Sequence, residues 1–181
     1  MKNIIIDDLH FELMIDYDQI QKRIRLIGID INLRYEDKHP VFIGVLNGCF
    51  MFMADLMKQV HIPCEMSFVK LASYSGTDQG RISELIGVGM DLTGRHVVIV
   101  EDIVDTGLTL SWLKANLESR GAADVKILTI LRKPEAAKVE VDVKYVGFDI
   151  PKDFVVGYGL DFDEKYRNLS FIGVLAKHMY E

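Results

Sequence analysis

The sequence predicts an α/β fold with a mostly parallel central sheet that is flanked by helices and carries a small hood lobe. Short apolar runs alternate with segments of helical periodicity, as in chains that place helices on a sheet. The apolar runs are continuous rather than alternating with polar residues, which is typical of strands buried on both faces. The length of 181 residues fits one domain, so we expect a single domain over residues 1–181.

Apolar spacing indicates the elements of the first half of the chain. From residue 17 to residue 37, apolar side chains recur at helical spacing, which predicts an amphipathic helix. The run VFIGVL, residues 41–46, ends in Asn-Gly and is expected to be a buried strand. A helix over residues 49–60 and a strand over residues 65–74 follow. A polar, glycine-containing stretch, residues 75–81, comes next.

The alternation of strands and helices continues in the middle of the chain. We expect strands over residues 84–90 and 96–102. We expect a helix over residues 108–120, because its leucines share one face and Gly121 is a natural stop. A further strand is expected over residues 125–132, which completes a sheet covered by helices.

The pattern loosens after Pro134. Only short strand-like pieces are expected there, over residues 143–148, 154–157 and 171–175. These pieces, from about residue 134 to residue 181, are expected to form the small hood over one edge of the sheet together with the N-terminal residues.

Composition excludes several classes of protein. With 21 basic and 27 acidic residues the net charge is −6, which argues against a nucleic-acid partner bound by a broad basic surface. The two cysteines, Cys49 and Cys64, are expected to be small buried hydrophobes in a reducing compartment. The N-terminus is no signal peptide, and no apolar stretch approaches the roughly 20 residues of a membrane helix. We therefore expect a cytoplasmic protein with no membrane partner.

The segment VVIVEDIVDTGLTL, residues 97–110, carries the strongest chemical signal. An apolar run ends in Glu101 and Asp102, and Asp105 precedes Thr-Gly at the start of a helix. In open α/β sheets ligands bind beyond the carboxyl ends of the strands. Backbone N–H groups and two hydroxyls at this turn suit a phosphate, while the acids suit ribose hydroxyls or Mg²⁺. The alternative is that the two adjacent acids solvate a strand end and Asp105 caps the helix.

This segment resembles the phosphoribosyl-pyrophosphate signature of the type I phosphoribosyltransferases. Further pieces resemble the bacterial hypoxanthine-guanine members of that family: residues 45–56 (VLNGCFMFMADL), Ser73-Tyr74, Arg132-Lys133-Pro134, and residues 146–169. The resemblance implies the type I phosphoribosyltransferase fold. It also implies transfer of the 5-phosphoribosyl group from phosphoribosyl pyrophosphate to N9 of hypoxanthine or guanine. The products would be IMP or GMP and pyrophosphate, with Mg²⁺ as cofactor and a homodimer or homotetramer as assembly.

The resemblance assigns roles to the residues of the signature. Glu101 and Asp102 contact the ribose hydroxyls and Mg²⁺. The 5′-phosphate is held by the loop that follows them, composed of Asp105, Thr106, Gly107, Leu108 and Thr109. Asp105 also acts as the general base at N7 of the purine.

Pyrophosphate is assigned to Leu46, Asn47 and Gly48, together with the distant Arg167. In the family, backbone amides of this loop bind pyrophosphate, and the peptide bond before its second residue can be cis. The family commonly carries Lys or Arg where this chain has Asn47, so a positive charge is missing here. The alternatives are an ordinary Asn-Gly turn and a surface arginine.

The purine is assigned to the C-terminal third. Lys133 donates to the exocyclic O6, Phe154 stacks on the ring, Val155 offers backbone groups, and Asp161 lies near the base and a second Mg²⁺ site. Ser73 and Tyr74 open a mobile loop that excludes water from the reacting centre. The alternatives are a solvated loop lysine, a core phenylalanine, a solvated acid and a plain hairpin loop.

Two other functions compete with this interpretation. A regulator that senses phosphoribosyl pyrophosphate could keep the signature, although the net charge of −6 and the absence of spare length argue against it. A xanthine-preferring enzyme is a closer alternative, because specificity at C2 of the purine depends on pocket details.

Overall fold

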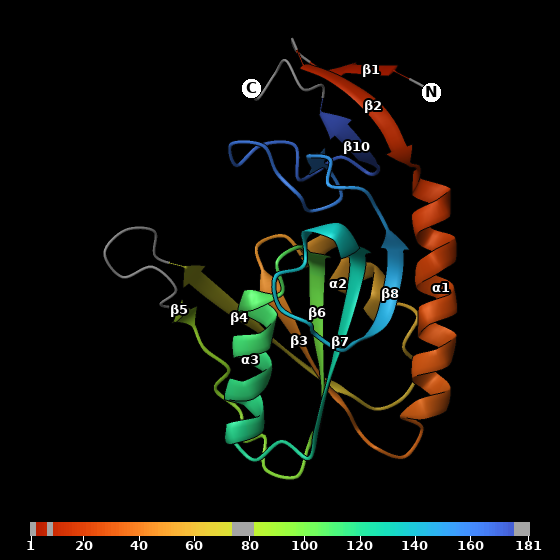
Figure 1. Ribbon diagram of the computed structural model, residues 1–181. Coiled ribbons are helices and arrows are strands. Elements are labelled where there is room, and N and C mark those ends of the chain that lie inside the picture. Colours follow the sequence, from red (N-terminus) through yellow and green to blue (C-terminus); the bar gives the residue numbers. More distant parts are fainter. Residues whose placement is uncertain (1–2, 7–8, 74–81, 176–181) are drawn as a thin grey trace.

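The computed structural model describes residues 3–6, 9–73 and 82–175, and it confirms the predicted mixed α/β class (Figure 1). A six-stranded sheet has the strand order β5-β4-β3-β6-β7-β8. Its strands are β3 (Val41–Leu46), β4 (Glu65–Ser73), β5 (Ile82–Ile86), β6 (His96–Val104), β7 (Asp124–Arg132) and β8 (Val143–Asp149). All neighbours pair in parallel except β5, which runs antiparallel to β4.

Three helices cover the two faces of this sheet. They are α1 (Tyr17–Arg34), α2 (Phe50–Met57) and α3 (Leu108–Ser119), with a short 3₁₀ helix, η1, at Pro134–Ala136. Four of the five isoleucines of α1 and the apolar side of α2 are buried in one core cluster, and three leucines of α3 lie in another on the opposite face. This double cover explains why β3 and β6 are continuous apolar runs.

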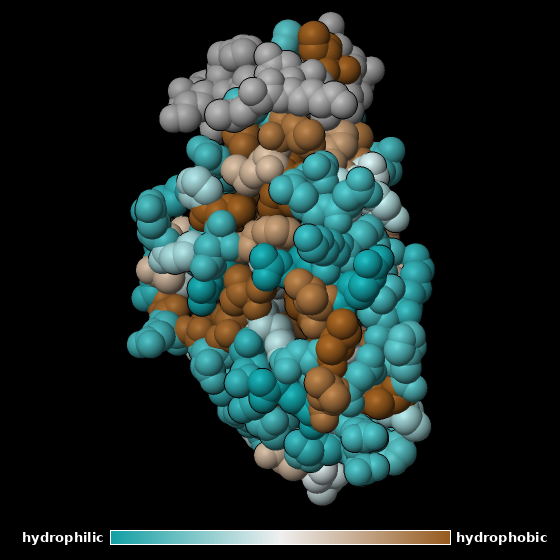
Figure 2. All heavy atoms as spheres, turned by 90° about the vertical axis from the view of Figure 1, so that its right-hand side faces the viewer, coloured by the Kyte–Doolittle hydropathy of each residue, from teal (hydrophilic) through white to brown (hydrophobic). Residues whose placement is uncertain are grey.

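α1 starts directly after its N-cap, Asp16, which forms a reciprocal cap with Gln19, and it ends earlier than predicted. The Asp16 carboxylate accepts from the Gln19 N–H at 2.8 Å, and the Gln19 side chain accepts from the Asp16 N–H at 3.0 Å. The helix ends at Arg34 rather than at residue 37, because Tyr35 turns away from helical geometry as its cap. Its outer face is exposed at Leu26 and Leu33, and Figure 2 shows apolar side chains among hydrophilic ones on this side.

A second, four-stranded antiparallel sheet has the order β1-β2-β10-β9. It joins β1 (Asn3–Ile6) and β2 (Leu9–Ile15) from the N-terminus to β9 (Val155–Val156) and β10 (Ile172–Leu175). Figure 1 shows this small sheet beyond the carboxyl ends of the parallel strands. We call residues 150–175 the hood segment.

Three expectations are corrected. Residues 143–149 form β8 of the central sheet, not a piece of the hood, because they pair in parallel with β7. The strand expected over residues 84–90 is β5, which ends at Ile86 where its ladder with β4 stops. Cys49 is buried as expected but Cys64 is exposed, because it lies in the connection before β4 rather than in the core.

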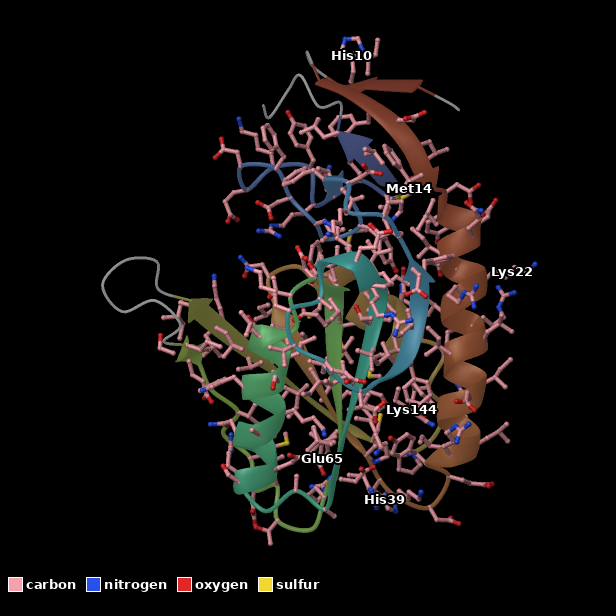
Figure 3. All side chains as sticks on the ribbon, in the orientation of Figure 1. His10, Met14, Lys22, His39, Glu65 and Lys144 are labelled. Carbon is pink, nitrogen blue, oxygen red and sulfur yellow. The ribbon has the colours of Figure 1, made fainter. Side chains whose placement is uncertain are left out.

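Polar contacts join neighbouring segments at the amino ends of the parallel strands, the end of the sheet away from the hood. The Arg95 guanidinium donates to Glu65 at 2.6 Å and to the His39 carbonyl at 3.2 Å. Figure 3 shows His39 and Glu65 at the end of the molecule far from His10 and the small sheet. Within the described part of the chain, no helix is long and apolar enough to cross a membrane.

Candidate active site

The order of the strands opens a crevice between β3 and β6. From β3 the chain adds β4 on one side, and from β6 it adds β7 on the other. The β3–β6 ladder stops at Gly44 and Val100, whereas β3 stays paired with β4 to Leu46 and β6 with β7 to Val104. The carboxyl ends of β3 and β6 therefore part, at the place where open α/β sheets bind their ligands.

The predicted pyrophosphate loop leaves β3 at this crevice. The Leu46–Asn47 peptide bond is cis, as the sequence resemblance implies. Gly48 lies against the Asp102 carboxylate so closely that a side chain at this position would collide with it. Cys49 follows, and burial raises the pKa of its thiol, with a further rise from the charges of Glu101 and Asp102. The loop and the acid pair therefore face each other across the crevice.

Glu101 and Asp102 lie inside β6, which runs to Val104, two residues beyond its predicted end. Both residues are buried, at 8% and 9% exposure. Asp102 N–H donates to Glu101 Oε1 at 3.1 Å, and Ile103 N–H donates to Asp102 Oδ1 at 2.7 Å. Burial raises the pKa of Glu101 well above its usual range, and the neighbouring Asp102 adds to the rise. Burial also raises the pKa of Asp102, although its hydrogen bonds and the charge of Arg167 oppose this.

The carboxylates of this acid pair suit a magnesium ion that takes its other ligands from elsewhere. The described residues contain no group of three or more His, Cys, Asp or Glu side chains placed to hold a metal by themselves. Mg²⁺ commonly binds through one or two carboxylates and takes its remaining oxygens from substrate phosphates and water. Burial disfavours the charged form of these two adjacent carboxyls, and a bound cation favours it. The pair therefore fits that manner of binding.

The predicted phosphate loop follows β6 and leads into α3. It lines a cavity of about 180 Å³ whose walls run from Glu101 to Leu110. Gly107 has φ +80°, and a side chain there would come within 2.7 Å of the Val139 carbonyl oxygen. The Thr106 carbonyl accepts from the N–H groups of Lys138 and Val139 at 3.0 and 3.1 Å. These contacts hold the turn on the side away from the cavity. The N-terminus of α3, which can bind an anion, faces the cavity.

Asp105 and Lys133 line one larger cavity of about 760 Å³. They meet because Lys133 N–H donates to the Val104 carbonyl at 2.9 Å, which joins the ends of β6 and β7. Lys114 and Arg132 line the same cavity and were not predicted as site residues. Arg132 precedes Lys133 in the Arg132-Lys133-Pro134 motif, so this motif also pointed to Arg132 as a site residue. Its guanidinium forms two hydrogen bonds with Asp149, at 2.7 and 3.0 Å.

The remaining residues predicted for the base come from the hood segment. Phe154 is 37% exposed and packs edge-on against Phe162, with ring centroids 6.0 Å apart. Val155 is buried in β9 and pairs with Val174 of β10. Asp161 forms an ion pair with Arg167 at 3.0 Å, so these two predicted residues meet in the hood segment.

The predicted mobile loop is only partly described. Ser73 is the last residue of β4, where it pairs with Ile82 of β5. Tyr74 and residues 75–81 lie outside the described residues.

Comparison with known proteins decides the family. A sequence model of the family "Phosphoribosyl transferase domain" matches residues 16–163, which include the acid pair and the loops on both sides of the crevice. The chain belongs to the phosphoribosyltransferase family. The resemblance expected from the signature segment is confirmed by this match.

Its relatives include proteins named hypoxanthine-guanine phosphoribosyltransferase. The protein of Mycobacterium avium is 44% identical over 177 residues, covering 93% of this chain and 87% of the relative. The protein of Bacillus subtilis is 41% identical over 172 residues, covering 94% of this chain and 96% of the relative. A solved hypoxanthine phosphoribosyltransferase of Staphylococcus aureus has a TM-score of 0.90 and 37% identity, and the match covers 94% of each chain.

Proposed function

We propose that this phosphoribosyltransferase transfers the 5-phosphoribosyl group from phosphoribosyl pyrophosphate to N9 of hypoxanthine or guanine. The products are IMP or GMP and pyrophosphate, as in purine salvage. The observation that supports this most is the gathering of the pyrophosphate loop, the acid pair and the phosphate loop around one crevice. The names of the relatives support the choice of purine.

The reaction exchanges one bond at C1 of the ribose for another. The bond from C1 to the pyrophosphate oxygen breaks, and the leaving group takes the electron pair. The purine N9 forms the new bond to C1, and Asp105 accepts the proton that the ring loses at N7. Positive charge builds on the sugar between these events, so water must be kept away from C1.

In this proposal each part of the crevice holds a different part of the substrate. The N–H groups and hydroxyls of residues 105–109 hold the 5′-phosphate, and Glu101 and Asp102 accept from the ribose hydroxyls. Backbone amides at residues 46–48, with Arg167, bind the departing pyrophosphate. These contacts hold the reacting atoms in line, which by itself lowers the barrier of a two-substrate reaction.

We propose Mg²⁺ as the cofactor, held by Glu101 and Asp102, with Asp161 near a second ion. When bound, Mg²⁺ neutralises the charge of the pyrophosphate group. The buried position of the acid pair supports the first site, because these carboxyls gain most from a neighbouring cation. The Asp161 carboxylate forms an ion pair with Arg167, which the proposal assigns to pyrophosphate.

Lys133 selects the base in this proposal. Its ammonium donates to the O6 atom of a 6-oxopurine, whereas a 6-amino group would leave the ammonium without an acceptor. Phe154 stacks on the ring and Val155 offers backbone groups to its edge. The shared cavity of Lys133 and Asp105 supports this arrangement, because the two groups must reach opposite parts of one purine.

We also propose that the protein is a cytoplasmic homodimer or homotetramer that binds neither nucleic acid nor membrane. The net charge of −6 supports the absence of a nucleic-acid partner. Light scattering on the purified protein measures the assembly.

The assay that tests the function measures pyrophosphate release with phosphoribosyl pyrophosphate, Mg²⁺ and one of four purines. We expect turnover with hypoxanthine and guanine, little with adenine, and none without a base. Fast turnover with xanthine alone would favour the xanthine-preferring alternative. Absence of turnover with every base, in protein that binds phosphoribosyl pyrophosphate, would favour the regulator.

A further inference from the structure

Three consecutive residues of the hood segment form a tight turn over the pyrophosphate loop. Gly157, Tyr158 and Gly159 all have positive φ, at +99°, +51° and +102°. The N–H of Tyr158 donates to the Leu169 carbonyl at 2.8 Å, and the N–H of Gly159 donates to the Arg167 carbonyl at 2.9 Å. These two hydrogen bonds join the turn to the segment that carries Arg167.

Gly159 also touches the pyrophosphate loop directly. A side chain on Gly159 would collide with the Gly48 carbonyl, just as a side chain on Gly48 would collide with Asp102. Arg167 Nη1 donates to the Gly159 carbonyl at 2.9 Å from the other side. Gly48 therefore lies between the Asp102 carboxylate and Gly159, whose carbonyl binds Arg167, and neither glycine has room for a side chain.

The Tyr158 side chain ties this stack to the helices beneath it. It is 1% exposed, and its hydroxyl donates to Asp55 Oδ2 of α2 at 2.7 Å, across 103 residues of sequence. The same oxygen accepts from Gln21 Nε2 of α1 at 2.6 Å. Lys58 donates to the other oxygen at 2.8 Å. α2 is the helix that follows the pyrophosphate loop, so Tyr158 and the loop share one support.

We propose that the Tyr158–Asp55 hydrogen bond is a latch that positions the hood turn against the pyrophosphate loop. This inference rests on the proposed function. Asn47 carries no charge, so the loop must bind pyrophosphate through backbone groups and through Arg167. The loop lies on one side of the Gly48–Gly159 contact and Arg167 lies on the other. The latch keeps these two glycines in contact. Tyr158 is thus a positioning residue for the pyrophosphate end of the substrate.

The test replaces Tyr158 by phenylalanine, which keeps the buried ring and removes only the hydroxyl. The dissociation constant for phosphoribosyl pyrophosphate with Mg²⁺ is measured by calorimetry without a purine. We expect it to rise about tenfold, equivalent to about 1.4 kcal/mol, the scale of one hydrogen bond to a charged group. The KM for the purine is expected to change less than about twofold, because the latch does not contact the Lys133 side of the site.

Four further variants separate positioning from general loss of structure. Tyr145→Phe removes the hydroxyl of another buried tyrosine, one remote from the hood turn in sequence, and should leave both constants unchanged. Asp55→Asn keeps an oxygen that accepts from Tyr158, so it should bind phosphoribosyl pyrophosphate better than Asp55→Ala. If both act through this hydrogen bond, the double variant of Tyr158→Phe with Asp55→Ala should bind phosphoribosyl pyrophosphate no more weakly than Asp55→Ala alone.

The outcomes separate the latch from the proposed function. If the wild type binds phosphoribosyl pyrophosphate and turns over, but Tyr158→Phe binds it equally well, the latch is wrong and the function stands. If the variant binds about tenfold more weakly while the wild type turns over no purine, the latch stands and the function is wrong. A wild type that does not bind phosphoribosyl pyrophosphate overturns both.

Discussion

Glu101 and Asp102 place two carboxyls where burial disfavours their charge. A folded protein tolerates such a pair at a cost in stability, and sites that bind cations or hydroxyls often carry that cost. The interpretation of these acids as ligand-binding groups rather than as a solvated strand end is supported by their burial, since a solvated pair would be exposed.

Replacing Glu101 by Gln should stabilise the protein at pH 7.5 and lower its activity. The folded pKa of Glu101 is raised, so between the unfolded value of about 4.3 and the folded value the native state holds a proton that the unfolded state has lost. The stability of the wild type therefore falls as pH rises through that window. We expect a gain of about 0.5–2 kcal/mol for the variant at pH 7.5, shrinking towards pH 4. Urea unfolding at both pH values measures this gain in stability. An equal loss of stability at both pH values would contradict the raised pKa of Glu101 as its cause.

Replacing Asp105 by Asn should lower kcat by roughly 10²–10⁴, the range for loss of a general base. The amide keeps the shape of the side chain, so the thermal unfolding midpoint should stay close to that of the wild type. Asp37→Asn, an exposed acid beyond α1, is the matched control and should leave kcat unchanged. Turnover of Asp105→Asn within a few-fold of the wild type would remove Asp105 from this role.

At the scale of elements, local patterns predicted most of the central sheet. Apolar runs located β3, β6 and β7, and isoleucine spacing located α1. Periodicity could not show that β6 continues to Val104, because its last residues are held by the ladder with β7 rather than by an apolar run. β8 was placed in the hood because its sequence resembles the short pieces around it, and only pairing with β7 shows otherwise. β1 and β2 were not predicted, since a short run beside acids becomes a strand only when partners such as β10 supply its hydrogen bonds.

The candidate site shows the same division between local and distant information. The acids and the phosphate loop form one segment, so their proximity followed from the sequence. The approach of Gly159 to Gly48, and of Tyr158 to Asp55, joins segments far apart in the chain and leaves no local pattern. The roles that the resemblance gives to Lys133, Phe154 and Asp161 stay predictions.

The reciprocal cap at the start of α1 yields a prediction for an element remote from the crevice. Asp16→Ala removes the oxygen that accepts from the Gln19 N–H, so the first turn of α1 loses a partner. We expect a loss of about 1 kcal/mol in the free energy of unfolding, typical of a lost N-cap, with kcat unchanged. Asp16→Asn should recover most of it, because Asn also caps well. Chemical denaturation of the three proteins gives the comparison, and equal stability of Asp16→Ala and wild type would show that the cap contributes nothing.

At the scale of the whole molecule, the hood segment lies beyond the carboxyl ends of the parallel strands (Figure 1), and there Gly159 touches Gly48 of the central sheet's loop. The central sheet supplies the acids and both loops, while the hood segment supplies Arg167 and the proposed stacking ring. Neither part holds all of the proposed site residues, so we expect the contacts between them to affect binding as well as stability.

Removing divalent metal should abolish turnover, since the pyrophosphate group carries too much charge to bind beside two carboxyls without a cation. Excess chelator should reduce pyrophosphate release to background, and added Mg²⁺ should restore it. Thermal unfolding in chelator should remain close to that in buffer, because the described side chains form no complete metal site of their own. Full activity in excess chelator would rule out the proposed cofactor.

The most direct measurement is a crystal structure of the protein with IMP or GMP. The account predicts that the 5′-phosphate lies on residues 105–109, with the ribose hydroxyls on Glu101 and Asp102 and the purine between Lys133 and Phe154. A nucleotide bound elsewhere, with that loop free of phosphate, would contradict it.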